Sequence, residues 1–565
     1  MKSSRRSFLK FAGVGIGGLM MGAPFAGLRK AKRPNFLFII TDDMFMREWN
    51  IRPEGRSADG RVRNYTPNID RLINEGMYFN RMYANSSVCT PSRYSCITGR
   101  FPSRCPQAQE RSVKNSGQVR ISFNTHILSE ESTGAKLLRQ AGYFTGFVGK
   151  NHALNFKRPN IPPDLEKKDP FSPEVSAWAK GRQADIVKAL KEQQGFEFAE
   201  NVYWGGAGVG MGDAFRHHNI DWTVEGGLHF LDEASKRDNP WYLYFSTTLL
   251  HGPTDKDENG WPGRYKADER VSGEGMLKSR PDVEPYMPPR NTIPGRIKKA
   301  GANPSTGDVT WLDDGIGALL KKLEELKMLD NTLIIMFNDN GMDNGGKNTG
   351  YNEGYNVSSF AWGGMVSHGV TESLAGGVDF VPTFLDMAGV RKEKWAYQVD
   401  GKSLAPIFKN PQAKAHKSMY CEIGHSKTVF TDDGWMFLAV RHPEEIKSDR
   451  VRQERFNNAW GKHAAPDGSS PDSPYDHHGM CPAGPTPDTM GYRRAKVAPS
   501  YYDSDQLYNL KEDPSQQVNL AENPKYRQKT KEMRQLLKSY LNTIPGKFGE
   551  LKTEYKALAP IDSAK

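Results

Sequence analysis

The stretch Phe36-Leu37-Phe38-Ile39-Ile40-Thr41-Asp42-Asp43 passes from a wholly apolar run to a pair of acids. An apolar run of this length is typical of a strand that is buried on both faces of a sheet. A second stretch with the same pattern runs from Leu333 to Phe337 and ends in Asn338-Asp339-Asn340-Gly341. Because open α/β sheets bind ligands at the carboxyl ends of their strands, we predict that both polar ends lie at one edge of a sheet. The competing interpretation is that each acid is a helix N-cap or a turn residue.

The rest of the chain alternates between strand-like and helix-like patterns, which predicts an α/β fold. Two further strands are predicted, within 142–149 and over 241–246, and polar groups follow both of them: Lys150 and His152 after the first, His251 after the second. Helices are predicted near 66–77, 135–138, 228–231, 312–326 and 378–385. Residues 157–215 are predicted to be mostly loop and 254–305 a long excursion, because both are rich in Pro, Gly or charge.

The run Cys89-Thr90-Pro91-Ser92-Arg93 continues to Thr98-Gly99-Arg100 and is predicted to be a helix that stops at its glycine. A cysteine at a helix entrance, close to an arginine, is expected to have a lowered pKa and to be reactive. A buried structural cysteine is the simpler interpretation of Cys89 taken alone.

The whole run is more specific than its cysteine, and it resembles the sulfatase signature Cys-x-Pro-Ser-Arg followed by Thr-Gly. Other blocks of the sequence match landmarks of that family in the same order. They are Asp42-Asp43, Gly149-Lys150-Asn151-His152, His251-Gly252-Pro253, Asp339-Asn340-Gly341, Lys347 with Glu353-Gly354, Val378-Asp379 through Pro382-Thr383, Asp400-Gly401, Leu507-Tyr508-Asn509-Leu510, Asp513-Pro514 and Asn519-Leu520. The chain is therefore similar to the formylglycine-dependent type I sulfatases of the alkaline phosphatase superfamily.

This resemblance implies a fold as well as an activity. We expect a large, mixed but mostly parallel sheet sandwiched by helices, as in alkaline phosphatase. A smaller C-terminal α+β subdomain should carry an antiparallel sheet and a terminal helix, and an amphipathic pattern over 533–541 agrees with that helix. The expected domains are a signal region (1–33), a catalytic domain (34–412) and a C-terminal subdomain (413–565).

The resemblance also implies a metal site and a modified residue. Oxygen ligands from acids and an amide suit a hard divalent cation, with Ca²⁺ expected and Mg²⁺ as the alternative. Cys89 is expected to be converted to 3-oxoalanine (formylglycine). The expected metal-site residues are Asp42, Asp43, Cys89, Asp339 and Asn340.

The remaining expected site residues supply positive charge and move protons. A sulfate ester is an anion, and more negative charge develops on its leaving oxygen, so cations and a proton donor are needed. The resemblance implies that Arg93 and Lys150 hold the formylglycine hydrate and that Asp339 assists its attack on sulfur. His251, with Lys347, is expected to protonate the leaving alcohol, and His152 to deprotonate the hydrate afterwards. Lys150, His251 and Lys347 are also the expected substrate-binding residues. The sequence departs from the family pattern at Asn151, Gly252 and Asn356.

The N-terminus indicates export. Ser4-Arg5-Arg6-Ser7-Phe8-Leu9-Lys10 reads as a twin-arginine motif, and the Gly-rich apolar stretch after it is not a convincing membrane span. We therefore expect the twin-arginine export machinery and a formylglycine-installing enzyme as partners, and a periplasmic or secreted location. Eight basic residues and no acid lie within 1–33, out of a net charge of +11 for the chain, so nucleic acid is not an expected partner. Five cysteines leave four that could pair if Cys89 is modified.

Export favours a sulfated saccharide as the substrate. The alternatives are a phosphonate or phosphodiester hydrolase of the same superfamily, a catalytically dead carbohydrate-binding homologue, and a metal-binding structural protein. The three long segments 157–215, 254–305 and 441–500 are candidate walls of a substrate cleft. Their candidate contacts to sugars or sulfates are Trp204, Trp261, Arg264, His477 and His478.

Overall fold

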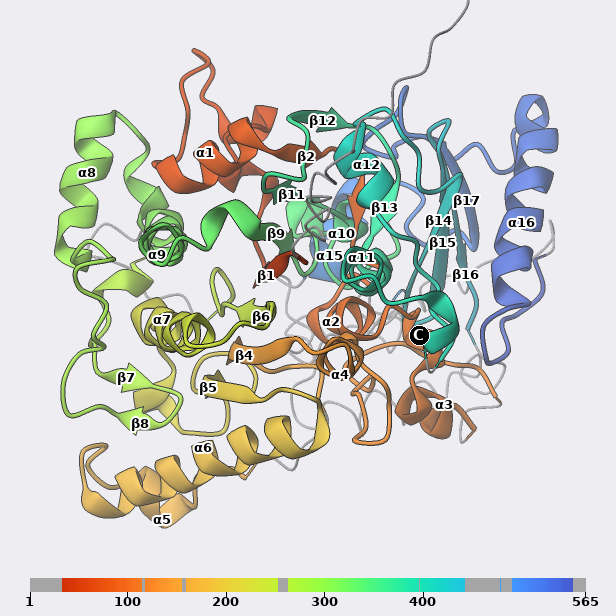
Figure 1. Ribbon diagram of the computed structural model, residues 1–565. Coiled ribbons are helices and arrows are strands. Elements are labelled where there is room, and N and C mark those ends of the chain that lie inside the picture. Colours follow the sequence, from red (N-terminus) through yellow and green to blue (C-terminus); the bar gives the residue numbers. More distant parts are fainter. Residues whose placement is uncertain are drawn as a thin grey trace, which may run out of the picture. The chain divides into compact units, whose positions relative to one another are not determined.

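The chain is built around an eight-stranded sheet in the order β12-β2-β11-β9-β1-β6-β4-β5 (Figure 1). The computed structural model describes residues 33–113, 117–154, 159–252, 263–395, 397–442, 478 and 490–551. The strands of this sheet, in spatial order, are β12 (Gly369–Thr371), β2 (Met77–Phe79), β11 (Ser359–Trp362), β9 (Thr332–Asn338), β1 (Asn35–Thr41), β6 (Trp241–Ser246), β4 (Phe144–Lys150) and β5 (Phe198–Tyr203). Strands β9, β1, β6, β4 and β5 are mutually parallel, and β11 runs antiparallel to its neighbours β9 and β2. This confirms the mixed, mostly parallel sheet.

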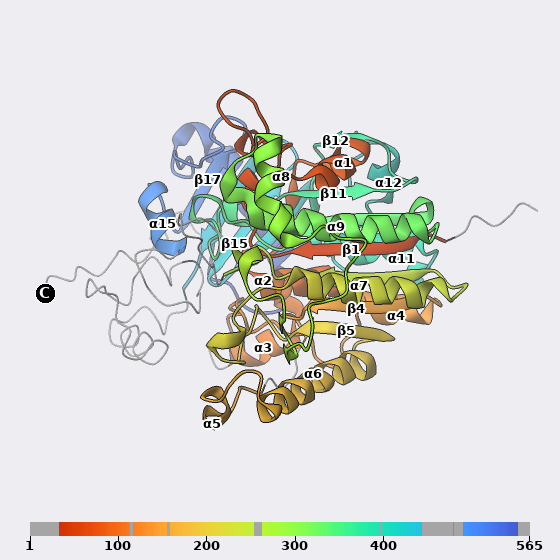
Figure 2. The same cartoon turned by 90° about the vertical axis from the view of Figure 1, so that its left-hand side faces the viewer.

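Alternate residues of the central strand point to opposite helical layers. Leu37 and Ile39 pack against α1 (Pro67–Glu75), α7 (Ile220–Ser235), α8 (Ile293–Ala300) and α9 (Gly307–Glu325). Phe36, Phe38 and Ile40 pack with α2 (Cys89–Thr98), α4 (Gly134–Gln140), α6 (Pro173–Gln193), α11 (Phe380–Met387) and α12 (Ala405–Lys409). Figure 2 shows α7 and α9 running alongside β1. The sheet is therefore covered on both faces, which explains why β1 is apolar from Phe36 to Ile40.

Helix α9 shows how sequence spacing produces this packing. Leu312, Ile316, Leu319 and Leu323 recur every three or four residues and are at most 1% exposed. Burial of each such side chain stabilises the fold by about 1.5–3 kcal/mol. The helices predicted near 66–77, 135–138, 228–231, 312–326 and 378–385 are confirmed as α1, α4, α7, α9 and α11.

The prediction of a mostly irregular 157–215 is wrong. This region contains α5 (Pro163–Glu166), the 21-residue helix α6 and the edge strand β5. The buried positions of α6 include Val175, Ala179, Ile186 and Leu190, but also Arg182 and Gln183. Two polar residues on the buried face conceal the apolar stripe that would identify the helix from sequence.

The C-terminal part carries the expected antiparallel sheet and terminal helix. Its strands are β14 (Ser418–Ile423), β15 (Ser426–Thr431), β16 (Trp435–Val440) and β17 (Asp505–Asn509), all antiparallel. Helix α16 (Arg527–Leu541) packs Met533 and Leu537 on one face of this sheet, and Tyr83, Tyr351 and Tyr355 pack on the other. The expected boundary near residue 412 falls between α12 and β14 and stays a prediction.

The remaining elements are short. A three-stranded sheet has the order β10 (Asn356–Val357), β3 (Met82–Tyr83), β13 (Ala375–Gly376), and β7 (Val271–Ser272) pairs with β8 (Gly275–Met276). The other helices are α3 (Pro106–Val113), α10 (Asn352–Tyr355) and α15 (Met490–Val497). None of the helices within the described residues combines the length and the apolar character needed to cross a bilayer.

Candidate active site

Two neighbouring strands deliver the acidic residues to one edge of the sheet. The parallel register pairs Thr41 of β1 with Asn338 of β9, so Asp42 and Asp339 leave the sheet side by side. The amide of Asn338 joins the two exits: its Nδ2 donates to the Met44 carbonyl (2.9 Å) and its Oδ1 accepts from the Met44 N–H (3.1 Å). Asp43 has a left-handed backbone, with φ of 57°. Such a conformation is uncommon for a residue other than Gly, Asn or Asp.

Cys89 is the first residue of α2, and every residue of this helix is buried. Its Sγ lies 3.5 Å from Asp42 Oδ1 and 3.4 Å from Asn340 Oδ1. Gly99 ends the helix in the left-handed conformation, with φ of 70°, as the sequence predicts. A helix that buries so many hydroxyls and an arginine is not optimised for apolar packing, which indicates a functional element.

The expectation of a lowered pKa for Cys89 is wrong. Burial, followed by the negative charge of Asp339, raises the pKa of this thiol well above its ordinary value. Lys347 and Lys150 oppose the shift but do not reverse it. The unmodified residue is therefore a protonated thiol in this setting, and its helix position does not by itself make it a nucleophile.

Four side chains form a cluster with the character of a metal site. Ligand atoms of Asp42, Asp43, Cys89 and Asp339 all lie within 4.8 Å of one another. Asn340 completes the group, because its Nδ2 donates to Asp43 Oδ1 at 2.8 Å. Three buried carboxylates so close together repel one another, and a hard divalent cation with oxygen ligands is a group that relieves such repulsion. The donor set therefore fits the expected Ca²⁺ or Mg²⁺.

The pKa values of the carboxyl groups in this cluster shift in different directions. Burial opposes ionisation of Asp42, but the surrounding cations, Lys150 first, hold its pKa well below the ordinary value. Burial and the neighbouring Asp42 charge raise the pKa of Asp339 to about 7. Groups whose pKa values are driven apart in this way are concentrated at functional sites.

Three cations surround the carboxylates. Arg93 donates from Nε to Asp339 Oδ2 at 3.0 Å and from Nη1 to Ser246 Oγ at 2.6 Å. Lys347 Nζ contacts both Asp43 oxygens at 2.5 Å, and Lys150 Nζ forms a short ion pair with Asp42 Oδ2. All three cations are buried, so their charges act at low dielectric and attract an anion strongly.

The two histidines differ in how closely they join the cluster. His251 Nε2 lies 3.6 Å from Asp43 Oδ2, and its Nδ1–H donates to the Gly252 carbonyl at 2.6 Å. With 34% of its side chain exposed, His251 lies where the site opens to solvent. His152 follows β4 and lies beside Phe123, with ring centroids 5.7 Å apart and the rings tilted by 38°. Among the described residues it makes no hydrogen bond or ion pair to the cluster, and its Nδ1 is buried without a partner.

Two positioning residues were not predicted from the sequence. Asn338 links the strand exits, and Ser246, the last residue of β6, contacts Arg93. Asn338 directly precedes an expected ligand and Ser246 ends a predicted strand, so position relative to a strand end is the signal that could have identified them. Of the departures from the family pattern, Asn151 accepts from the Leu154 N–H at 3.1 Å and supports the turn that contains His152.

Three of the proposed contacts to sugars or sulfates are buried structural residues. Trp204 donates from Nε1 to the Arg182 carbonyl at 3.2 Å. Arg264 forms an ion pair with Asp308 at 2.7 Å, and His478 Nδ1 lies 2.8 Å from Ser426 Oγ. Trp261 and His477 lie outside the described residues. The four described cysteines, Cys89, Cys96, Cys105 and Cys421, are all free thiols, so no disulfide joins them.

Comparisons with known proteins point to a single family. A family profile described as Sulfatase matches residues 34–390. The chain is 25% identical to an N-acetylglucosamine-6-O-sulfatase of Bacteroides thetaiotaomicron over 90% of this chain and 86% of that protein. It is 24% identical to human arylsulfatase A over 71% of this chain and 74% of that protein. With an N-acetylgalactosamine-6-O-sulfatase of B. thetaiotaomicron and an ulvan-active sulfatase of Formosa agariphila, the match spans only 60% and 50% of the relative's length.

Solved structures show the same fold. The yidJ protein of Bacteroides fragilis superposes with a TM-score of 0.54 at 15% identity, covering 90% of this chain and 96% of that one. A protein solved in complex with its substrate D-glucosamine-2-N,6-O-disulfate superposes with a TM-score of 0.52 at 19% identity, covering 90% and 98%. The expected fold class is thereby confirmed.

Proposed function

This chain belongs to the sulfatase family, and we propose that it hydrolyses sulfate esters of a saccharide, with formylglycine at position 89 and a bound divalent cation. The observation that carries the proposal is one buried cluster in which Cys89 meets three carboxylates and three cations. The names of the relatives support a sulfated saccharide as the substrate class.

The carboxylates of Asp42, Asp43 and Asp339 and the amide of Asn340 would hold the cation, with Ca²⁺ preferred and Mg²⁺ as the alternative. When present, the cation supplies Lewis-acid charge and formylglycine supplies the reactive carbonyl group. Arg93 keeps Asp339 and Asp42 in place, since its guanidinium contacts both carboxylates, at 2.9 and 3.8 Å.

The cationic side chains bind and orient the anionic ester. Lys150 and Lys347 place two buried positive charges beside Cys89, where the sulfate group would be held. His251 is oriented by its Nδ1–H bond to Gly252, so its Nε2 faces the cluster and can deliver a proton to a leaving oxygen at the open side. His152 is proposed as the base that takes up a proton in the site.

Export is part of the proposal. The twin-arginine segment 1–33 lies almost entirely outside the described residues, and its sequence supports a periplasmic or secreted enzyme that is modified and loaded with its cation before export. The catalytic domain over 34–412 and the C-terminal subdomain over 413–565 are proposed with the same boundaries as before.

The test is sulfate release from defined sulfated saccharides by the wild-type and Cys89→Ala proteins, after maturation in a formylglycine-competent host. Cys89→Ala should abolish turnover and leave the fold and cation binding intact. Cys96→Ala is the matched control, because Cys96 is a buried thiol on the same helix and should retain activity. Sulfate release by the Cys89→Ala protein would overturn the mechanism, and faster hydrolysis of aryl phosphates than of aryl sulfates would favour the phosphoester alternative.

A further inference from the structure

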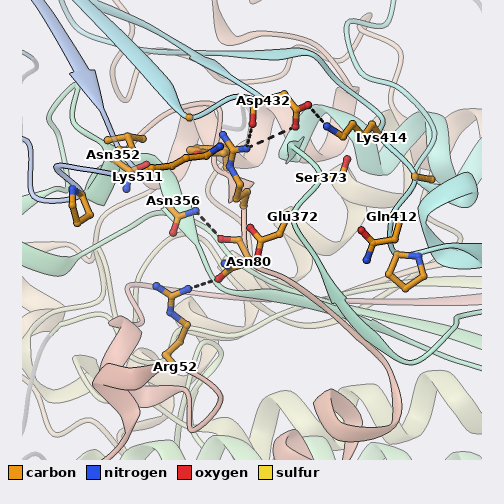
Figure 3. A pocket seen from close by; sticks show the side chains of 17 residues that line it. Arg52, Asn80, Asn352, Asn356, Glu372, Ser373, Gln412, Lys414, Asp432 and Lys511 are labelled. Carbon is orange, nitrogen blue, oxygen red and sulfur yellow. Dashed lines mark hydrogen bonds and ion pairs between the residues drawn. The ribbon is translucent and has the colours of Figure 1, made fainter.

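A second pocket lies outside the catalytic cluster. It has a volume of about 620 Å³ and none of the site residues described above lines it. Its walls come from the segments after β1, β2 and β12, from α10 and β10, and from the C-terminal sheet (Figure 3). The lining residues used below are Arg52, Asn80, Asn352, Glu372, Gln412 and Lys511.

The strand register places this pocket at the same edge of the sheet as the active site. Tyr78 of β2 pairs with Phe360 of β11, which pairs with Met336 of β9. Because both pairings are antiparallel, β2 runs in the same direction as β9, and Asn80 lies level with Asn338. Two strand spacings separate them, which is about 10 Å. Asn80 in the pocket lining therefore lies at the same edge of the sheet as the strand end that carries Asp339.

One segment of chain connects the two places. After β9, the chain supplies Asp339 and Asn340 to the cluster, then Lys347, and five residues later Asn352 to the pocket. Five residues span at most roughly 18 Å. The pocket and the catalytic cations are thus built on a common piece of backbone.

The lining is polar and already ordered. Arg52 Nη1 donates to Asn80 Oδ1 at 2.7 Å, and Asn80 Nδ2 donates to Glu372 at 2.8 Å (Figure 3). Planar amide, guanidinium and carboxylate groups of this kind hydrogen-bond neighbouring hydroxyls of a sugar ring in pairs. Most pockets for drug-like ligands are lined mainly by apolar groups, so this composition favours a hydroxyl-rich ligand.

Two groups in the pocket have unused bonding capacity. Asn352 Oδ1 is buried and accepts no hydrogen bond from the described residues. The Lys511 ammonium is exposed and, within the same described part of the chain, has no ion-pair partner, while Lys414 in the same wall is paired with Asp432. In total, four cationic side chains face two acidic ones in the lining. The pocket therefore has spare positive charge for an anion.

We propose that this pocket is a second saccharide-binding site, which takes a sulfated sugar unit of the same polymer whose ester is hydrolysed at position 89. The proposal rests on the proposed function for the identity of the polymer. Binding at the pocket anchors the chain of the saccharide and leaves the chemistry at Cys89 unchanged. Lys511 would pair with the sulfate group, and the exposed Gln412 would bind a hydroxyl.

The test compares a long and a short substrate in the full-length protein. The pocket variant is Lys511→Glu combined with Gln412→Ala, two exposed side chains whose loss leaves the hydrogen bonds of Arg52 and Asn80 in place. Lys299→Glu on α8 is the charge-matched control. The probes are sulfated hexasaccharides of chondroitin sulfate and of carrageenan, their chemically desulfated forms, and 4-nitrophenyl sulfate. Binding of the hexasaccharides is measured by calorimetry in the Cys89→Ala background, where no turnover interferes.

We expect at least one sulfated hexasaccharide to bind about tenfold more weakly to the pocket variant, the loss expected for one charge-assisted contact. The Lys299→Glu control should bind it normally. In the Cys89-containing protein, the pocket substitutions should raise KM for that hexasaccharide. The kcat/KM for 4-nitrophenyl sulfate should stay within twofold of the value for the protein with an unchanged pocket.

The proposal is overturned if the pocket variant binds every hexasaccharide as tightly as the control, if the desulfated forms bind equally well, or if none of the hexasaccharides binds. Failure of the proposed function would look different. In that case no sulfate is released from any probe by the Cys89-containing protein, whereas the calorimetric difference between pocket variant and control is still measured.

Discussion

The molecule contains two clusters of buried charge, one at the edge of the large sheet and one in the C-terminal sheet. Both consist of acidic and basic side chains, but their roles differ. In the C-terminal sheet, Glu422 of β14 pairs directly opposite Lys427 of β15. Its carboxylate also accepts from the Ser103 N–H (2.7 Å), the Ser103 hydroxyl and the Tyr420 hydroxyl (2.9 Å). A carboxylate has about four acceptor positions, so these donors satisfy it completely.

The cluster around Cys89 is not satisfied in this way. Asp42, Asp43 and Asp339 crowd together, and the resulting repulsion helps to raise the pKa of Asp339. Nearby, the buried hydroxyl of Thr90 and Nδ1 of His152 have no hydrogen-bond partner among the described residues. A cluster whose groups are all paired stabilises the fold, whereas a cluster of crowded carboxylates and cations with unpartnered polar groups beside it is arranged for groups that bind to it.

The strongest test of this difference is to make the same substitution, Lys to Met, in each cluster. Lys150→Met removes a fully buried ammonium from Asp42, and it should lower kcat/KM for a sulfate ester by about 10²–10³-fold. The reason is that the lost charge acts where negative charge develops in the reaction. Sulfate release under steady-state conditions measures the effect, with far-UV circular dichroism as the check on folding. An activity within tenfold of wild type would remove Lys150 from the site.

Lys427→Met is the matched change in the C-terminal sheet, because Lys427 is also a buried lysine paired with a single carboxylate. It should lower the free energy of unfolding by about 3 kcal/mol, since Glu422 would be left as a buried charge with neutral donors only. The activity of the folded protein should be unchanged. Urea denaturation measures the loss, with Arg71→Ala at the exposed Arg71–Glu324 pair as a control that costs under about 1 kcal/mol. A Lys427→Met protein as stable as this control contradicts the structural role.

The edge of the sheet could be predicted from sequence because its pattern is local. A buried strand needs an unbroken apolar run, and the two runs are followed by Thr41-Asp42 and by Asn338-Asp339. The predicted position of Asp42 and Asp339 at one edge of the sheet is therefore confirmed. The stop of α2 at Gly99 is likewise a local signal, since the residue adopts a left-handed conformation. Local patterns of this kind specify strands, caps and the residues beside them.

Features that depend on distant parts of the chain could not be predicted. The entrance of α2 suggested an acidic thiol, but complete burial beside Asp339 raises the pKa of Cys89 instead. Helix α6 was missed because Arg182 occupies its buried face, where it bonds to the carbonyls of Pro159 and Val209. The second pocket is assembled from well-separated segments, and no single stretch of sequence carries its pattern.

The smallest predicted effect tests whether the unsatisfied cluster takes a cation. A cation that binds only the folded protein stabilises it by about 2.7 kcal/mol when its free concentration is 100 times Kd. Ca²⁺ should therefore shift the urea midpoint of the wild-type protein upward relative to protein in a chelator. The shift should disappear in Asp339→Asn, which loses one carboxylate of the cluster, and persist in Glu422→Gln, whose carboxylate belongs to the cluster that is already satisfied. The opposite outcome is that the wild-type protein has the same urea midpoint in Ca²⁺, in Mg²⁺ and in chelator. Pairing with Arg93, Lys150 and Lys347 would then be enough to satisfy the three acids. In that case the distinction between the two clusters would fail.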